Sequence, residues 1–132
     1  MKQSFFLISF LLLSLASFGQ EISFTKTRLL IDGKECLKIN SKDPNNVSIL
    51  DMDDNEIVFL KYIHDSKYGS LYTKIVFLDQ KLTFTSMSYI FTIKQLITKL
   101  VTDKTLKDCK LDPEKVEKFV LKYDEDVERP RQ

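Results

Sequence analysis

Apolar and polar positions divide the chain into two parts. Between residues 22 and 91, short runs rich in β-branched and aromatic residues alternate with turn residues, which is typical of antiparallel strands. Asp32-Gly33 is a strong hairpin signal, because both central positions of a type I′ turn need positive φ. The pattern predicts a β-meander of about six strands, at residues 22–31, 34–40, 47–52, 56–63, 71–78 and 82–91, with the longest loop at 64–70.

After residue 91 the period becomes helical. Apolar residues recur every three or four positions in 93–103 and in 113–128, so both ranges predict amphipathic helices. Thr92 and Gln95 form a capping box at the start of the first helix. Asp112 and Pro113 suit the N-cap and the first position of the second helix. The predicted fold class is α+β, with a meander followed by two helices packed on one face or end of the sheet.

The first nineteen residues carry a different pattern. Lys2 precedes an uncharged apolar stretch, and Ser17 and Gly19 supply the small residues of a cleavage site. These are the regions of a secretory signal peptide. The strongly apolar part is shorter than the roughly 20 residues that a membrane span needs. We therefore expect cleavage of residues 1–19, export to the periplasm, the cell surface or beyond, no stable membrane insertion afterwards, and one domain over residues 20–132.

The charge of the chain is balanced, with 20 basic and 19 acidic residues. Nucleic-acid affinity rests on neutralising phosphates, and no basic stripe stands out in this sequence. The composition therefore argues against a nucleic-acid partner.

Export changes the interpretation of the two cysteines, Cys36 and Cys109. In an oxidising compartment a disulfide between them is favoured over two separate buried thiols. Strand alternation in 34–40 argues the other way, since it places Cys36 on the solvated face with Lys34 and Lys38. The sequence favours the bridge without deciding between these two arguments.

Candidate chemistry in the sequence is weak. His64, the only histidine, is followed by Asp65 and Ser66, but triads form from groups brought together in space and neighbours in a loop do not suit that geometry. Asp51-Met52-Asp53-Asp54-Asn55 resembles the start of a calcium loop, yet the Gly and Glu of that motif are missing further on, so an oxygen-rich turn explains it better. We predict no catalytic residues, no metal site and no cofactor.

Tyrosines supply the one positive signal for binding. Tyr62, Tyr68 and Tyr72 lie in and around the predicted loop that also holds His64. Tyrosine is enriched at protein interfaces, although packing against the sheet would also explain these residues. We take Tyr62, His64, Tyr68 and Tyr72 as the candidate partner-binding residues.

Three functions remain open from the sequence. The first is an exported, non-catalytic protein that binds another protein. The second is a carrier that holds a small apolar ligand between sheet and helices, in a pocket lined by residues such as Phe59, Phe77 and Leu96. The third is a hydrolase that uses carboxylates or His64.

Overall fold

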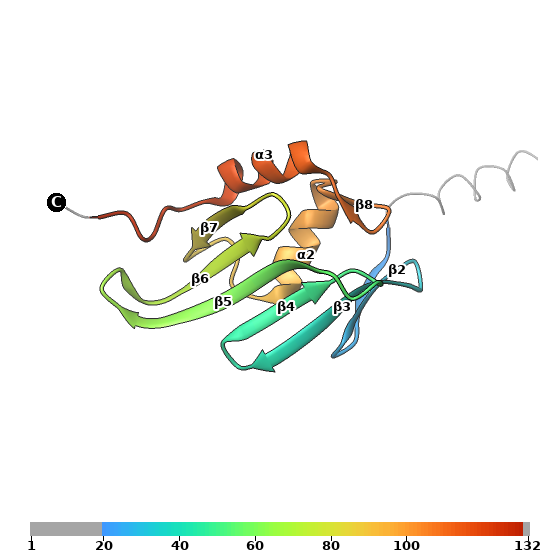
Figure 1. Cartoon of the computed structure of the whole chain (residues 1–132), viewed down its shortest axis with the longest axis horizontal. Helices are drawn as coiled ribbons and strands as arrows, with labels where there is room; N and C mark the ends of the chain where they lie inside the picture. The colour runs from blue at the N-terminus through green and yellow to red at the C-terminus, as the bar shows by residue number, and fades with distance from the viewer. Residues whose placement is uncertain (1–19, 131–132) are drawn as a thin grey trace, which may run out of the picture.

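The computed structural model describes residues 20–130, so the predicted signal peptide, residues 1–19, lies outside the described residues. One antiparallel sheet holds seven strands in chain order (Figure 1). The predicted α+β fold is confirmed, with seven strands in the meander where about six were expected. The strands are β1 (Ile22–Phe24), β2 (Arg28–Ile31), β3 (Lys34–Asp43), β4 (Asn46–Leu50), β5 (Glu56–Ser66), β6 (Gly69–Phe77) and β7 (Leu82–Ser86).

The additional strand comes from a break in the predicted strand 22–31. The backbone N–H of Thr25 donates to the Arg28 carbonyl (2.9 Å), and β1 folds back onto β2. The polar residues between Phe24 and Arg28 form this turn. The Asp32-Gly33 turn occurs as predicted, with φ of 52° and 79°.

The prediction of a loop at residues 64–70 is wrong. β5 and β6 continue through it, with His64 opposite Leu71 and Ser66 opposite Gly69, so that only Lys67 and Tyr68 form the turn. At the other end, β7 stops at Ser86, before the expected residue 91.

The disulfide between Cys36 and Cys109 is present, with 5.3 Å between the Cα atoms. The alternation argument against it is wrong because β3 contains a β-bulge. Leu37 pairs with Leu29 and Glu35 pairs with Leu30, which leaves Cys36 as the extra residue. A bulge changes the side to which the following residues point. As a result Cys36 and Leu37 are both buried, each with 1 % exposure.

Cys109 lies in the turn of a second, two-stranded sheet that the sequence pattern did not predict. β8 (Leu106–Lys107) and β9 (Lys110–Leu111) are joined by Asp108 and Cys109. Both turn residues have positive φ, 53° and 62°, as a type I′ hairpin requires. The turn thereby presents Cys109 to the bulge in β3.

Within residues 20–130 the helices are α2 (Ile93–Thr102) and α3 (Pro113–Tyr123). The predicted capping box of α2 is confirmed, and Asp112 caps α3 as expected. The predicted end of the second helix at residue 128 is wrong, because Asp124 is already extended. We call residues 124–130 the C-terminal segment. Carboxylates of this segment accept hydrogen bonds from residues of the sheet.

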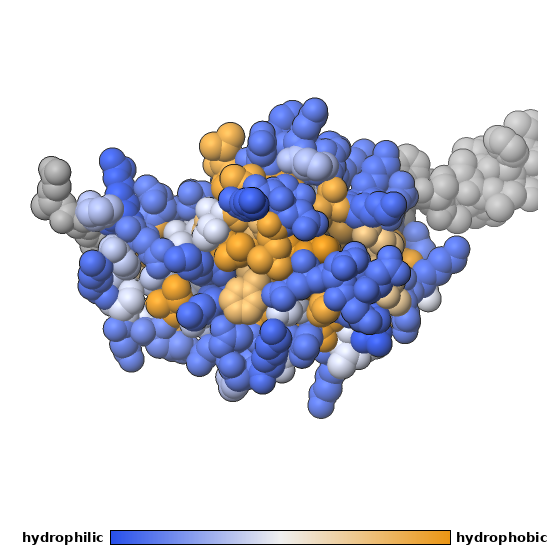
Figure 2. Space-filling view, in the orientation of Figure 1, coloured by the Kyte–Doolittle hydropathy of each residue, from blue (hydrophilic) through white to orange (hydrophobic). Residues whose placement is uncertain are grey.

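The core lies between one face of the sheet and both helices. Its buried side chains form one cluster that draws on β2 to β7, α2, β8 and α3. Its largest fully buried aromatic members are Phe77, Phe84 and Phe119. Figure 2 shows an apolar area near the centre of one face of the molecule, surrounded by hydrophilic side chains. No helix within residues 20–130 is long and apolar enough to cross a membrane.

Candidate functional site

The β5–β6 hairpin extends beyond its neighbours in the sheet (Figure 1). β5 pairs with β4 only as far as Lys61, and β6 pairs with β7 only from Thr73 onward. Residues 62–72 therefore form a two-stranded extension, which we call the projecting ribbon. All of the sequence-predicted partner-binding residues lie in it, namely Tyr62, His64, Tyr68 and Tyr72.

Tyr62 fixes the ribbon on the helix side of the sheet. Its hydroxyl donates to the Phe91 carbonyl (2.7 Å), and the two rings lie with centroids 6.3 Å apart. Burial raises the pKa of Tyr62. His64 makes a second link, since its Nε2 lies 2.7 Å from Oδ1 of Asn45 in the β3–β4 turn. Both residues thus hold the ribbon against the rest of the sheet.

Tyr72 fixes the ribbon from the opposite face. Strand alternation points Tyr72 and Lys74 away from the helices, yet Tyr72 is only 1 % exposed because the C-terminal segment covers it. The Tyr72 hydroxyl donates to Oε2 of Glu128 (2.6 Å), and Lys74 Nζ donates to Oε1 (2.8 Å). Burial, followed by the bond to Glu128, raises the pKa of Tyr72. The bond from Lys74, followed by that from Tyr72, lowers the pKa of Glu128.

Glu125 holds the start of the C-terminal segment in a pocket of backbone donors. Its Oε1 accepts from the Ser86 hydroxyl (2.9 Å) and from three successive N–H groups, those of Met87 (3.0 Å), Ser88 (2.8 Å) and Tyr89 (3.2 Å). Burial acts to raise the pKa of Glu125, but these hydrogen bonds outweigh it and the pKa is lowered.

The C-terminal segment therefore passes round the edge of β7. Ser86 lies opposite Thr73 on the helix side of the sheet, whereas Lys74 faces the other side. Glu125 binds on the first side and Glu128 on the second, and between them the Val127 N–H donates to Oγ1 of Thr85 (2.8 Å). Neither glutamate stood out in the sequence, because both fall within the predicted helix 113–128.

The turn of the ribbon remains open to contact. Tyr68 is partly buried, and Lys67 Nζ lies 5.0 Å from the centroid of its ring. The Tyr68 N–H donates to the Ser66 hydroxyl (3.0 Å), which fixes the turn. Met87 supports it from the side, because a Cβ added to Gly69 would lie 2.8 Å from Cε of Met87.

The same contacts define what chemistry His64 and the carboxylates can perform. The His64 ring bonds to an amide oxygen, and Ser66 Oγ accepts from a backbone N–H, so the two form no nucleophile–base pair. Asp51 Oδ1 accepts from the N–H groups of Asp53 and Asn55, both at 2.9 Å. The bond from Asn55 in particular lowers the pKa of Asp51. Among residues 20–130, no group of three His, Cys, Asp or Glu side chains could hold a metal ion.

We expect acid to weaken the attachment of the C-terminal segment. The pKa values of Glu125 and Glu128 lie below the ordinary value of 4.5 in the folded protein. Their contribution to stability is therefore complete above pH 4.5, the value in the unfolded chain, and is lost as the pH falls through the lower folded values. Glu125→Gln/Glu128→Gln should lower the free energy of unfolding at pH 7 by about 1–2 kcal/mol and flatten its pH dependence.

Urea unfolding followed by circular dichroism between pH 3 and pH 7 measures both effects. Glu117→Gln is the matched control, because Glu117 is an exposed carboxylate on α3. Equal pH dependence in the double variant and the control would contradict the role given to the two glutamates.

No protein-family model, curated protein or solved structure matches this chain.

Proposed function

We propose that the protein is an exported, non-catalytic binding protein that contacts another protein through the turn of the projecting ribbon. Two observations support export. Residues 1–19 have the pattern of a signal peptide, and the Cys36–Cys109 disulfide suits an oxidising compartment.

The observation that carries the binding proposal is the support of the ribbon from both faces. Tyr62 anchors one face and Tyr72 the other, while the turn at Lys67 and Tyr68 stays open. A surface that is ordered before binding loses less conformational entropy when a partner docks. Tyrosine at such a turn offers a broad contact with a polar end. Tyr62, His64 and Tyr72 then position the contact surface, and Tyr68 makes the contact.

The ribbon also offers a strand edge. Beyond Lys61, the N–H of Tyr62 still donates to the Asn45 carbonyl (2.9 Å), and residues 63–66 have no partner residue on β4. Free edges of this kind accept an added strand from another chain. A partner that binds at Tyr68 could therefore extend along β5 by backbone hydrogen bonds.

The packing of the core favours a protein partner over a small apolar ligand. Phe77 and Leu96 have 0 % exposure and belong to the packed core. Phe59 pairs with Val76 and alternates with the core residues Val58 and Leu60, so it points to the opposite face. These residues do not line one common cavity.

Photo-cross-linking tests the proposal in cells that make the full chain. We expect Tyr68→p-benzoylphenylalanine to form one dominant protein adduct, recovered in the exported fraction on a chain that has lost residues 1–19. Mass spectrometry of the adduct reads both the partner and the new amino terminus.

Leu121→p-benzoylphenylalanine is the control, because Leu121 is 83 % exposed and lies on α3, outside the ribbon. The same adducts from both positions, or none from position 68, would contradict the binding surface. An adduct that still carries residues 1–19 would contradict processing of the signal.

A further inference from the structure

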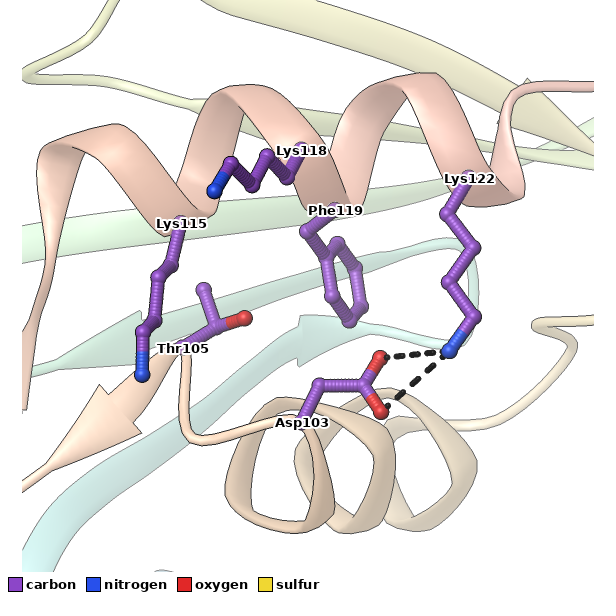
Figure 3. Close-up of a pocket in the computed structure, with 6 residues that line it drawn as sticks. All are labelled: Asp103, Thr105, Lys115, Lys118, Phe119 and Lys122. Carbon is purple, nitrogen blue, oxygen red and sulfur yellow. Dashed lines mark hydrogen bonds and ion pairs between the residues drawn. The ribbon is translucent and has the colours of Figure 1, made fainter.

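Three lysines of α3 share one face of the helix. Lys115, Lys118 and Lys122 are separated by three and four positions, the spacing that aligns side chains along a helix. Together with Asp103, Thr105 and Phe119 they line a pocket of about 290 Å³. Figure 3 shows Lys115 and Lys122 extending from α3 on either side of the Phe119 ring, toward the segment that carries Asp103 and Thr105.

The pocket has a surplus of positive charge. Its single carboxylate, Asp103, lies 3.3 Å from Lys122 Nζ. Within residues 20–130, Lys115 and Lys118 have no carboxylate at ion-pair distance. Two of the three ammonium groups are therefore available to an anion, in a protein whose formal net charge is only +1.

The inner wall of the pocket is apolar and fixed. Phe119 is 2 % exposed, and its ring packs edge-on against Phe77 and Phe84 at centroid distances of 5.9 and 6.0 Å. The aliphatic parts of the lysine side chains continue this apolar surface outward, as lysine stems commonly do.

Thr105 adds a polar group beside that wall. Thr105 is 1 % exposed, and it lines the pocket beside Phe119 with a side chain that carries a hydroxyl. In the pocket this hydroxyl can donate to an oxygen of a ligand.

We propose that this pocket binds a small organic carboxylate. Lys115, Lys118 and the Thr105 hydroxyl would hold the carboxylate oxygens, and an apolar body about the size of one ring would lie against Phe119. The apolar wall favours such a ligand over inorganic phosphate, which has nothing to place there. A volume of about 290 Å³ is at the lower limit for ligand sites, which restricts the ligand to a small molecule.

An amide NMR titration of the purified, disulfide-bonded protein tests this. Benzoate is the probe, and acetate, benzyl alcohol and inorganic phosphate each supply only part of its chemistry. We expect benzoate to shift the amides of Thr105 and of residues 115–119 saturably, and to bind at least tenfold more tightly than the other three compounds.

Three variants assign the contacts. Lys115→Gln/Lys118→Gln should weaken benzoate binding at least tenfold, and Thr105→Val should weaken it several-fold at nearly constant volume. Asp103→Asn should strengthen it, because it removes the only negative charge in the pocket. The control is Lys34→Gln/Lys42→Gln, which changes net charge equally at two exposed lysines of β3 and should leave binding unchanged.

Several results would overturn the proposal. Equal weakening in the control would mean that benzoate responds to net charge alone. If phosphate or acetate bound as tightly as benzoate, the contact between the ligand's ring and Phe119 would contribute nothing to binding. Shifts centred on other residues, or no saturable shift in the wild-type protein, would show that this pocket does not bind a carboxylate.

Discussion

Replacing both Cys36 and Cys109 by alanine is expected to lower the free energy of unfolding by about 4 kcal/mol. The disulfide joins residues 73 positions apart, so in the unfolded chain it closes a long loop and removes much conformational freedom. That loss is a large part of the roughly 5–15 kcal/mol that stabilises an ordinary domain. The structural effect should centre on the β8–β9 hairpin, which the bond attaches to the bulge in β3.

Urea unfolding followed by circular dichroism, with and without a reductant, measures this effect. The wild-type protein in reductant should approach the stability of Cys36→Ala/Cys109→Ala, and the double variant should not respond to reductant. A wild-type protein that is equally stable in both conditions would contradict the prediction.

Phe119→Ala is expected to lower the free energy of unfolding by about 3–5 kcal/mol, the usual cost of removing a buried aromatic side chain. Phe119 joins α3 to the sheet through Phe77 and Phe84, and it also contacts Tyr123 with a centroid distance of 4.6 Å. Removing the ring would leave a cavity between the helix and β6–β7 that these neighbours can fill only in part.

Leu121→Ala is the matched control, two positions further along the same helix. Leu121 is 83 % exposed, so the change should stay within about 0.5 kcal/mol. Both variants can be measured by urea unfolding at pH 7. A loss below about 1.5 kcal/mol for Phe119→Ala would show that α3 is not a principal cover of the sheet.

Local signals in the sequence predicted the elements that depend on near neighbours. The Asp32-Gly33 turn, the capping box of Thr92 and Gln95, and the Asp112-Pro113 start of α3 each act within a few residues. The disulfide followed from the expected compartment and was correct, although strand alternation argued against it.

Features that depend on distant partners were not predictable in this way. The position of Cys36 depends on a bulge that becomes visible only in the pairing with β2. The acidic run after Tyr123 looks like a solvated helix face until Ser86 and Tyr72 are brought close to it. Of the candidate site, the sequence identified the ribbon residues but not which of them are anchors. The spacing of Lys115, Lys118 and Lys122 was visible, but its meaning depends on the pocket wall formed by Phe119 and Thr105.

The chain-order arrangement of the sheet has a consequence for how the protein is made. Each new strand pairs with the one synthesised just before it, so the meander can assemble step by step from the amino terminus, by short-range contacts that form quickly. The helices that cover its apolar face, α2 and α3, are synthesised after the sheet. A partly made chain therefore holds a paired but uncovered sheet, a state prone to aggregation. The apolar face of the sheet stays exposed until α3 and the C-terminal segment have been synthesised and cover it and the edge of β7.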